Sequence, residues 1–407
     1  MNALKKGIIL LWISIFVIFT SLVFFVIGCN SSYLVTDIFK RISLTFLILA
    51  VLLLIYSIFL IIRYRFSRRF KKVKMIIISI IVSIYAIGCS SFLFILYGPN
   101  DTFRTWLITT AMATMNHQHY CKWFYSDDTI NAVLGQNYVA EGTDSTDPSL
   151  ITFDKEPVTY ANEYEREILE HDEDDLYKII RFEVNGCDAY LAAIYDPSKI
   201  SVGVSKWLGR SGQYIYDMAK EQDAILAING GGFFDPGYNS NGANPLGITI
   251  SNGEVITDDA YSSNNGGVIG LTWDNQLVLL RNVNAHDALN RGVRDAVTMG
   301  PFLIVNGKTA DIKGNGGWGY AARTAIGQRK DGIVLMLVVD SNEFRTKGAS
   351  MRDLADIMKR YGAINAANLD GGTSSAIVEH GKLINDPIDS ALRHKTRGIP
   401  TIFKVVA

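Results

Sequence analysis

The sequence predicts an α+β protein in which three N-terminal transmembrane helices precede a mixed α/β-sheet domain outside the cytoplasm. Three apolar stretches are each about 20 residues long, the length that a helix needs to cross the hydrocarbon core. They span 7–28, 42–62 and 75–98. From Leu176 onward, short apolar segments alternate with turn dipeptides, as in a sheet of short strands. We divide the chain into a three-helix membrane anchor (1–100), a juxtamembrane stalk and acidic linker (101–175) and a catalytic domain (176–407).

Positive charge between the second and third apolar stretches predicts the orientation. Seven basic residues crowd this loop: Arg63, Arg65, Arg68, Arg69, Lys71, Lys72 and Lys74. The positive-inside rule places such a loop in the cytoplasm. We interpret the first stretch as a retained helix rather than a signal peptide, because no cleavage site is obvious and two further stretches follow. Three crossings of the lipid bilayer then leave everything after Tyr97 outside the cytoplasm.

The remainder of the chain is acidic. Of 39 Lys and Arg and 40 Asp and Glu, residues 1–118 hold twelve and two, which leaves 27 basic and 38 acidic side chains in 119–407. Nucleic-acid binding needs a basic surface, so we expect no nucleic-acid partner. Residues 140–175 concentrate acidic and hydroxyl side chains without apolar periodicity, so we expect 119–175 to contribute little to the core.

Cysteine and histidine spacing offers little support for a metal. Cys121 and Cys187 lie outside the membrane, where they either pair or remain two thiols. His117 and His119 are possible metal ligands, but without a nearby carboxylate they also fit interfacial polar groups. No CxxC or His-Cys spacing typical of zinc occurs in the sequence. We predict no metal and no cofactor.

Two segments of the domain share one pattern, a helix followed by an apolar strand with a glycine-rich end. A helix near 210–221 precedes Ala224–Ile228, and a helix over 350–361, with Ser350 as its cap, precedes Ala363–Leu369. We expect the two strand ends to meet at one edge of a sheet, where binding sites often gather. An Asn-Gly dipeptide at 185–186 predicts a hairpin between the first two strands of the domain.

The first glycine-rich end joins an amide to aromatic residues. It reads Asn229, Gly230, Gly231, Gly232, Phe233 and Phe234. Glycines let the backbone approach a ligand closely, although a tight turn with core aromatics is an equally ordinary explanation. A phosphate-binding P-loop is excluded because no Gly-Lys-Ser/Thr follows.

The second glycine-rich end carries a carboxylate. It reads Asp370, Gly371, Gly372, Thr373 and Ser374, and it resembles a site more than a structural turn. Arg323 begins, and Asp340 ends, a strand whose middle is apolar. Each of these two side chains is either functional or an ordinary ion-pair partner or cap.

These segments together resemble the phosphodiester glycosidase family over about residues 180–405. The matching stretches are Asn229–Phe234, Gly300-Pro301 with Val305–Gly307, Arg323–Gly327, Val338–Asp340 before a loop containing Gly348, and Asn368–Ser374. The chain departs from the family pattern at Thr373 and Ser341, where glycine is usual.

The resemblance implies hydrolysis of sugar-1-phosphodiester bonds. Asp370 would face the anomeric carbon as base or nucleophile, and Arg323 would hold the departing phosphate through bidentate contact. Asn229 would orient sugar hydroxyls or water, and Asp340 would be a second carboxylate or orient Arg323. Backbone N–H groups of 230–232 and 371–372 would share the phosphate charge, while Phe233, Phe234, Thr373 and Ser374 would line the pocket.

The expected substrate is a sugar-phosphodiester in envelope, exopolysaccharide or teichoic-acid-type glycans, and the sequence names no protein partner. The main alternative is a non-catalytic polysaccharide-binding or exopolysaccharide assembly protein, which would tolerate the loss of Asp370. A membrane sensor is a weaker alternative, because membrane topology already explains the basic loop.

Overall fold

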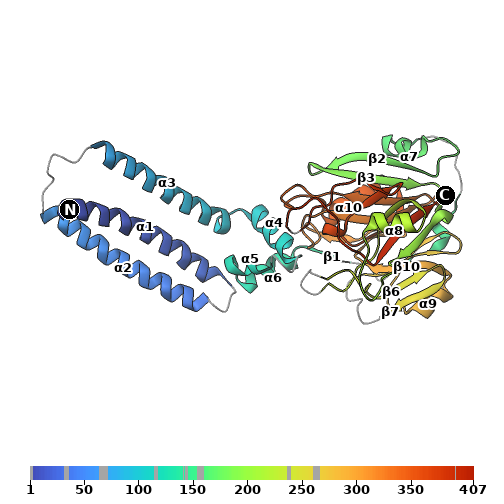
Figure 1. Cartoon of the computed structure of the whole chain (residues 1–407), viewed down its shortest axis with the longest axis horizontal. Helices are drawn as coiled ribbons and strands as arrows, with labels where there is room; N and C mark the ends of the chain where they lie inside the picture. The colour runs from blue at the N-terminus through green and yellow to red at the C-terminus, as the bar shows by residue number, and fades with distance from the viewer. Residues whose placement is uncertain are drawn as a thin grey trace. The chain divides into compact units, whose positions relative to one another are not determined.

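The computed structural model describes residues 3–31, 36–63, 72–113, 118–140, 142, 145–153, 160–235, 240–259, 266–389 and 391–407. The chain forms two compact units, Met1–Gly135 and Gln136–Ala407. They correspond to a helical N-terminal unit and a C-terminal unit built mainly from sheets (Figure 1).

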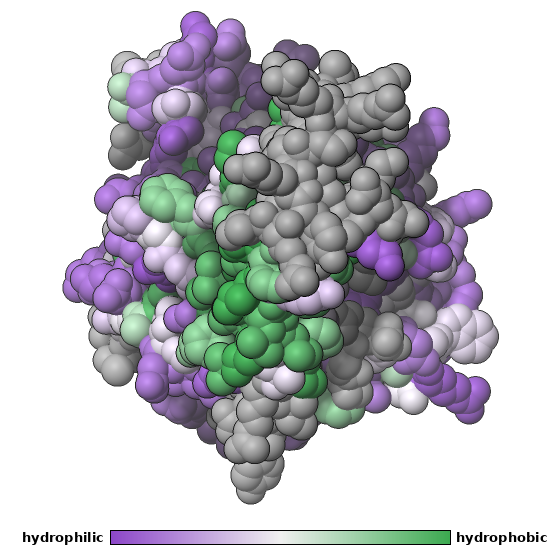
Figure 2. Space-filling model, turned by 90° about the vertical axis from the view of Figure 1, so that its left-hand side faces the viewer, coloured by the Kyte–Doolittle hydropathy of each residue, from purple (hydrophilic) through white to green (hydrophobic). Residues whose placement is uncertain are grey.

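Three long helices begin the N-terminal unit, α1 (Ala3–Asn30), α2 (Thr36–Arg63) and α3 (Lys72–Tyr97) (Figure 1). Each contains a window long and apolar enough to cross a membrane, which confirms the three predicted stretches. Many of their large hydrophobic side chains are exposed, and hydrophobic residues gather at the centre of the face in Figure 2. Residues 64–71 of the basic loop on which the orientation rests, with four of its seven basic residues, lie outside the described residues.

Three short helices complete this unit, α4 (Asp101–Met112), α5 (Gln118–Phe124) and α6 (Asp127–Gly135). They pack around Cys121 and Tyr125, which are both buried. His119 lies against the rings of Tyr120 and Trp123, at 4.0 and 5.0 Å between centroids, and His117 lies outside the described residues. Among the residues that the structure describes, no group of three His, Cys, Asp or Glu side chains is placed to hold a metal ion.

The C-terminal unit contains three main antiparallel sheets, which confirms the predicted α+β class. The largest runs in the order β12 (Lys308–Thr309), β11 (Phe302–Val305), β16 (Ala363–Asn368), β14 (Arg323–Arg329), β15 (Val334–Val339), β3 (Cys187–Ile194) and β2 (Tyr177–Val184). The second runs β18 (Lys382–Leu383), β17 (Ile377–Glu379), β5 (Ala224–Asn229), β19 (Thr401–Val406) and β4 (Ile200–Val204). The third runs β7 (Glu254–Asp258), β6 (Ile248–Ser251), β10 (Val293–Met299), β8 (Gly267–Thr272) and β9 (Leu277–Leu280).

The seven-stranded sheet is buried on both faces. Successive residues of β15 alternate between two core clusters, because side chains of a strand point to opposite faces in turn. Leu335 and Leu337 pack in the cluster that includes Leu354 of α10 (Met351–Arg360), and Met336 packs in the cluster that includes Phe403 of β19. Burial on both faces explains why β15 is apolar at every position.

The hairpin, the helix cap and the second helix that local sequence patterns predicted are all present. Asn185 and Gly186 both have positive φ, of 53° and 75°, and join β2 to β3 in a hairpin. Ser350 caps α10 in a capping box with Asp353. The second predicted helix is α8 (Ile215–Glu221), which covers the second sheet through Ile215 and Met218.

Residues of the acidic segment form part of the C-terminal unit. Its β1 (Tyr138–Ala140) pairs with β13 (Asp311–Lys313), and its α7 (Glu163–Leu169) inserts a fully buried Ile168 into the main core. The hydroxyl of Tyr195 donates to the carbonyl of Ile168 at 2.7 Å. Ile168 therefore packs in the main core, and how much residues 119–175 add to stability stays a prediction. Where an independently folding domain begins stays a prediction.

Candidate active site

Three strands of the seven-stranded sheet place polar residues at the same edge. Arg323 begins β14 and pairs with Val339 at the end of β15, so Asp340 follows directly beside it. Asp370 follows β16, whose end pairs with the start of β14. The segment from Arg323 to Asp340 is a hairpin rather than the single strand that we expected. The turn at Asp331-Gly332 folds it back and brings both polar ends to one edge.

The two glycine-rich strand ends meet, but they belong to different sheets. β5 lies in the second sheet and β16 in the seven-stranded sheet, which corrects the expectation of one shared sheet edge. The Asp370 N–H donates to the Gly230 carbonyl at 3.2 Å. The Asn229 side-chain amide donates to the Asp370 carbonyl at 2.7 Å. The candidate site therefore lies where the ends of two packed sheets join.

Asn229 is a positioning residue in this arrangement. Its side-chain oxygen accepts from the Thr324 hydroxyl at 2.7 Å and from the Ala376 N–H at 3.1 Å, while its amide nitrogen donates to Asp370. The side chain is 1% exposed. These contacts occupy the groups that we expected to orient sugar hydroxyls or water.

The backbone N–H groups of 230–232 are also engaged within the protein. Gly230 donates to the Thr401 carbonyl at 2.9 Å, Gly231 to the Thr401 hydroxyl at 3.1 Å and Gly232 to the Thr298 carbonyl at 3.0 Å. In this arrangement they are not available to share a phosphate charge. Glycine is needed at 231 for packing, because a Cβ there would lie 2.8 Å from the Thr298 carbonyl oxygen. Their role in substrate binding stays a prediction.

Asp370 combines burial with an open hydrogen-bonding position. Interactions with Ser374 and the Gly371 N–H favour the ionised form of its carboxylate, yet no group within the described residues hydrogen-bonds to Oδ2. Burial raises the pKa of Asp370 to about 6, against the lowering effect of Ser374 and Arg397. The carboxylate is therefore mostly ionised at neutral pH, with one buried oxygen that has no partner among the described residues.

Arg323 faces the same turn with one edge of its guanidinium. Nε donates to the Ala349 carbonyl at 3.3 Å, and Nη2 donates to the carbonyls of Trp318 and Gly319. Nη1 points toward the glycine turn, 3.4 Å from where a Cβ on Gly371 would lie. Burial lowers the pKa of Arg323 to about 10, so it stays positive at neutral pH. Nε and Nη2 are thus engaged within the protein, and the expected bidentate contact with phosphate stays a prediction.

Asp340 organises a neighbouring segment. Its carboxylate accepts from the Asn385 amide at 2.7 Å and from the Asp386 N–H at 3.0 Å. Burial raises the pKa of Asp340 to about 6. Both oxygens therefore have partners, and these partners lie on the segment after β18 rather than on Arg323.

The remaining predicted residues divide between buried and exposed positions. Phe233 is buried beneath the guanidinium of Arg397, which lies 4.7 Å from the ring centroid, whereas Phe234 is 58% exposed. The Thr373 hydroxyl donates to the Ile388 carbonyl at 3.4 Å, and Ser374 is buried beside Asp370.

Sequence reasoning missed two arginines. Arg397 pairs with Asp235 at 2.5 Å, and both charges influence Asp370. A basic residue and a glycine immediately before the last strand were the available signal. Arg345 lies in the loop after β15, with its Nη2 3.7 Å from where a Cβ on Gly372 would lie. No sequence feature distinguished Arg345 from an ordinary loop residue.

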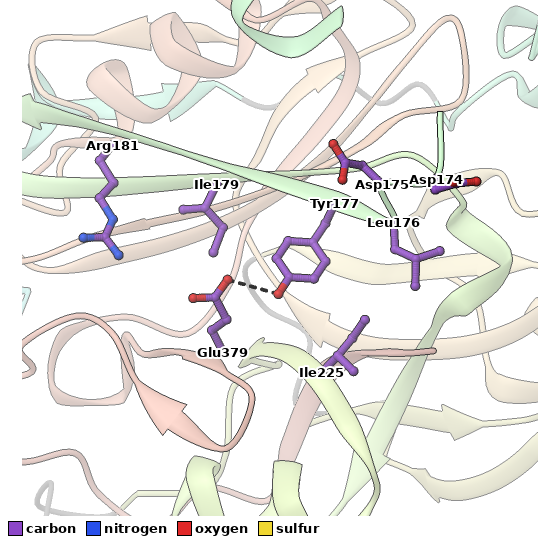
Figure 3. Close-up of a pocket in the computed structure, with 8 residues that line it drawn as sticks. All are labelled: Asp174, Asp175, Leu176, Tyr177, Ile179, Arg181, Ile225 and Glu379. Atoms are coloured by element: carbon purple, nitrogen blue, oxygen red, sulfur yellow. Dashed lines mark hydrogen bonds between the residues drawn. The ribbon is translucent and has the colours of Figure 1, made fainter. Parts of the chain in front are cut away.

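A separate cleft lies away from these residues. It has a volume of about 580 Å³ and runs between β2 and the ends of β5 and β17 (Figure 3). Tyr177 donates to Glu379 at 3.0 Å within it. The Glu379 carboxylate therefore already has a hydrogen-bond partner. Unlike Asp370, Glu379 does not follow a strand into a glycine-rich turn.

Comparison with known proteins identifies the class of this unit. Residues 222–406 match the family model for phosphodiester glycosidase. Residues 222–406 therefore form a phosphodiester glycosidase family domain, which confirms the resemblance read from the sequence for this part of the chain.

Individual relatives come from bacteria and animals. The SPbeta prophage-derived uncharacterized protein YomE of Bacillus subtilis (strain 168) is 29% identical over 209 residues, which are 49% of this chain and 31% of that protein. The N-acetylglucosamine-1-phosphodiester alpha-N-acetylglucosaminidase of Bos taurus is 35% identical over 69 residues, 17% of this chain and 13% of that protein. The matches therefore span about a third or less of these relatives.

Among solved structures, the catalytic domain of the zebrafish N-acetylglucosamine-1-phosphodiester alpha-N-acetylglucosaminidase, auto-inhibited by its pro-peptide, has a TM-score of 0.48 and 20% identity. The alignment covers 59% of this chain and 86% of that one. A hypothetical protein from Synechocystis has a TM-score of 0.40 and 17% identity, over 56% of this chain and 61% of that one.

Proposed function

We propose that the C-terminal domain is a glycosidase that hydrolyses sugar-1-phosphodiester bonds. The observation that carries this proposal is the buried carboxylate of Asp370, whose Oδ2 has no partner among the described residues and which lies in the field of the Arg323 guanidinium. Membership of the phosphodiester glycosidase family supports the same chemistry.

The bond itself explains why one carboxylate and one cation are the main requirements. When the bond between the anomeric carbon and the phosphate oxygen breaks, the electron pair leaves with a phosphomonoester. This group departs readily without strong protonation, unlike the leaving group in ordinary glycoside cleavage. Asp370 faces the electron-poor anomeric carbon, either attacking it or taking a proton from the attacking water. Nη1 of Arg323 stabilises the charge that develops on the phosphate.

Kinetics on two substrates test these roles. Asp370→Asn keeps the shape but removes the charge, so turnover should fall by orders of magnitude with a sugar-1-phosphodiester and with an aryl glycoside that carries no phosphate. Arg323→Lys should lose activity on the phosphodiester and lose much less on the aryl glycoside. Near-normal turnover in Asp370→Asn would remove Asp370 from the chemistry and point to Asp340. Absence of turnover by the wild type on both substrates would contradict the proposal and favour the non-catalytic glycan-binding alternative.

We further propose that the domain lies outside the cytoplasm and acts on envelope glycans. The basic loop between the second and third spans supports this orientation. Protease added to intact protoplasts should then release the C-terminal domain. Survival of the domain until the cells are lysed would show the opposite orientation.

A further inference from the structure

Two arginines converge on the turn formed by Gly371 and Gly372. Nη1 of Arg323 lies 3.4 Å from where a Cβ on Gly371 would be, and Nη2 of Arg345 lies 3.7 Å from where a Cβ on Gly372 would be. Gly372 has a φ of +64°, which residues with side chains rarely adopt. One guanidinium group therefore lies beside each glycine of the turn, and a side chain at either position would crowd it.

The loop that carries Arg345 is held in an unusual conformation. Arg345 has a φ of +55°, and a long side chain with positive φ persists only where its surroundings enforce it. Its N–H donates to the Asn342 carbonyl at 2.8 Å. The Asn342 side-chain oxygen accepts from the N–H groups of Thr346 at 2.7 Å and Lys347 at 2.9 Å. Strain of this kind often marks a functional site.

The charge of Arg345 has no partner within the described part of the chain. No hydrogen bond or ion pair to its guanidinium occurs there, and the acidic group that influences it is Asp389. The Asp389 carboxylate is already engaged by the side chain and N–H of Arg393. Burial lowers the pKa of Arg345. A partly buried cation without a counter-ion is unfavourable, so the arrangement favours an anionic ligand.

We propose that Arg345 binds the phosphate of the substrate over the Gly371–Gly372 turn, opposite Nη1 of Arg323. This inference rests on the proposed function and extends it to a residue that the sequence did not single out. With the phosphate held between two cations, the sugar would lie toward Oδ2 of Asp370, which has no hydrogen-bond partner among the described residues. Arg345 has more donors free than Arg323, so it should contribute more to phosphate recognition.

Titration with inorganic phosphate tests the site without using catalysis. The full chain in detergent should bind phosphate, and Arg345→Gln should weaken binding by about tenfold or more. The matched control is Arg360→Gln, which removes an exposed arginine from α10 and should leave phosphate binding unchanged. Arg345→Lys should restore part of the affinity. Equal binding by wild type and a folded Arg345→Gln, or equal competition by acetate, would overturn the phosphate assignment.

Kinetics then separate this inference from the proposed function. For Arg345→Gln, kcat/KM on a sugar-1-phosphodiester should fall about 100-fold, with less than about a threefold change on a phosphate-free aryl glycoside. An equal loss on both substrates would overturn the role of Arg345. If the wild type cleaves neither substrate, the proposed function fails, whereas the phosphate titration still decides whether the two arginines bind phosphate.

Discussion

The side-chain amide of Asn229 donates to the main-chain carbonyl of Asp370 at 2.7 Å and so joins the ends of two sheets. Because the Gly230 carbonyl also accepts from the Asp370 N–H, both backbone groups of Asp370 are held by the end of β5. The position of the carboxylate is therefore set by residues about 140 positions earlier in the chain. The Asn229 side chain is thus engaged in holding Asp370, and its role toward a ligand stays a prediction.

Asn229→Ala should destabilise the protein strongly. The change leaves the Thr324 hydroxyl, the Ala376 N–H and the Asp370 carbonyl without this partner. Each such buried group costs about 1–3 kcal/mol, so the free energy of unfolding should fall by about 3 kcal/mol or more in urea denaturation. Thr324→Val is the control because it removes one of these three contacts. An equally small loss in both variants would show that Asn229 does not organise the site.

Asp370→Asn should stabilise the protein at neutral pH while abolishing activity. The pKa of Asp370 is raised from 3.8 to about 6 in the folded state, so between these values the folded protein binds more protons than the unfolded chain. Stability from this group therefore falls as pH rises from 4 to 6 and stays low above 6. The variant lacks this penalty and should exceed the wild type by up to ~3 kcal/mol at pH 7.5. At pH 4 the two should be nearly equal. Urea denaturation at both pH values measures the difference in unfolding free energy between variant and wild type. The same difference at pH 4 and at pH 7.5 would show that Asp370 is not desolvated.

Local patterns in the sequence predicted the elements well, but they did not predict how the elements meet. The Asn-Gly turn at 185–186 and the Ser350 cap depend on neighbouring residues only, and both formed as expected. The placement of Arg345 beside Gly372 depends on a loop conformation and a pairing between distant strands, which no local pattern encodes. The engagement of the N–H groups of 230–232 was not predicted for the same reason, since their partners lie on β10 and β19.

Ile168→Ala should destabilise the C-terminal unit although Ile168 lies in an acidic segment. Its side chain is fully buried, and removing a buried aliphatic side chain costs about 2–5 kcal/mol. Leu150→Ala is a matched control, because Leu150 is 37% exposed and should cost far less. A protein that begins at Leu176 should accordingly be less stable in urea than one that begins at Gln136. Equal stability of the two would restore the interpretation of this segment as a linker.

The pH dependence of activity should distinguish the two buried carboxyl groups. The pKa values of Asp370 and Asp340 are both raised to about 6, so the acid limb of the rate profile alone does not assign the group responsible. If ionised Asp370 acts on the anomeric carbon, kcat/KM should fall about tenfold per pH unit below 6. Asp340→Asn should keep this limb at the same pH, because Asp340 only binds the Asn385 amide and the Asp386 N–H. Its effect should be a lower melting temperature, since an amide in place of the carboxylate offers one acceptor fewer to these donors. Loss of the acid limb in Asp340→Asn, with normal folding, would transfer the catalytic role from Asp370 to Asp340.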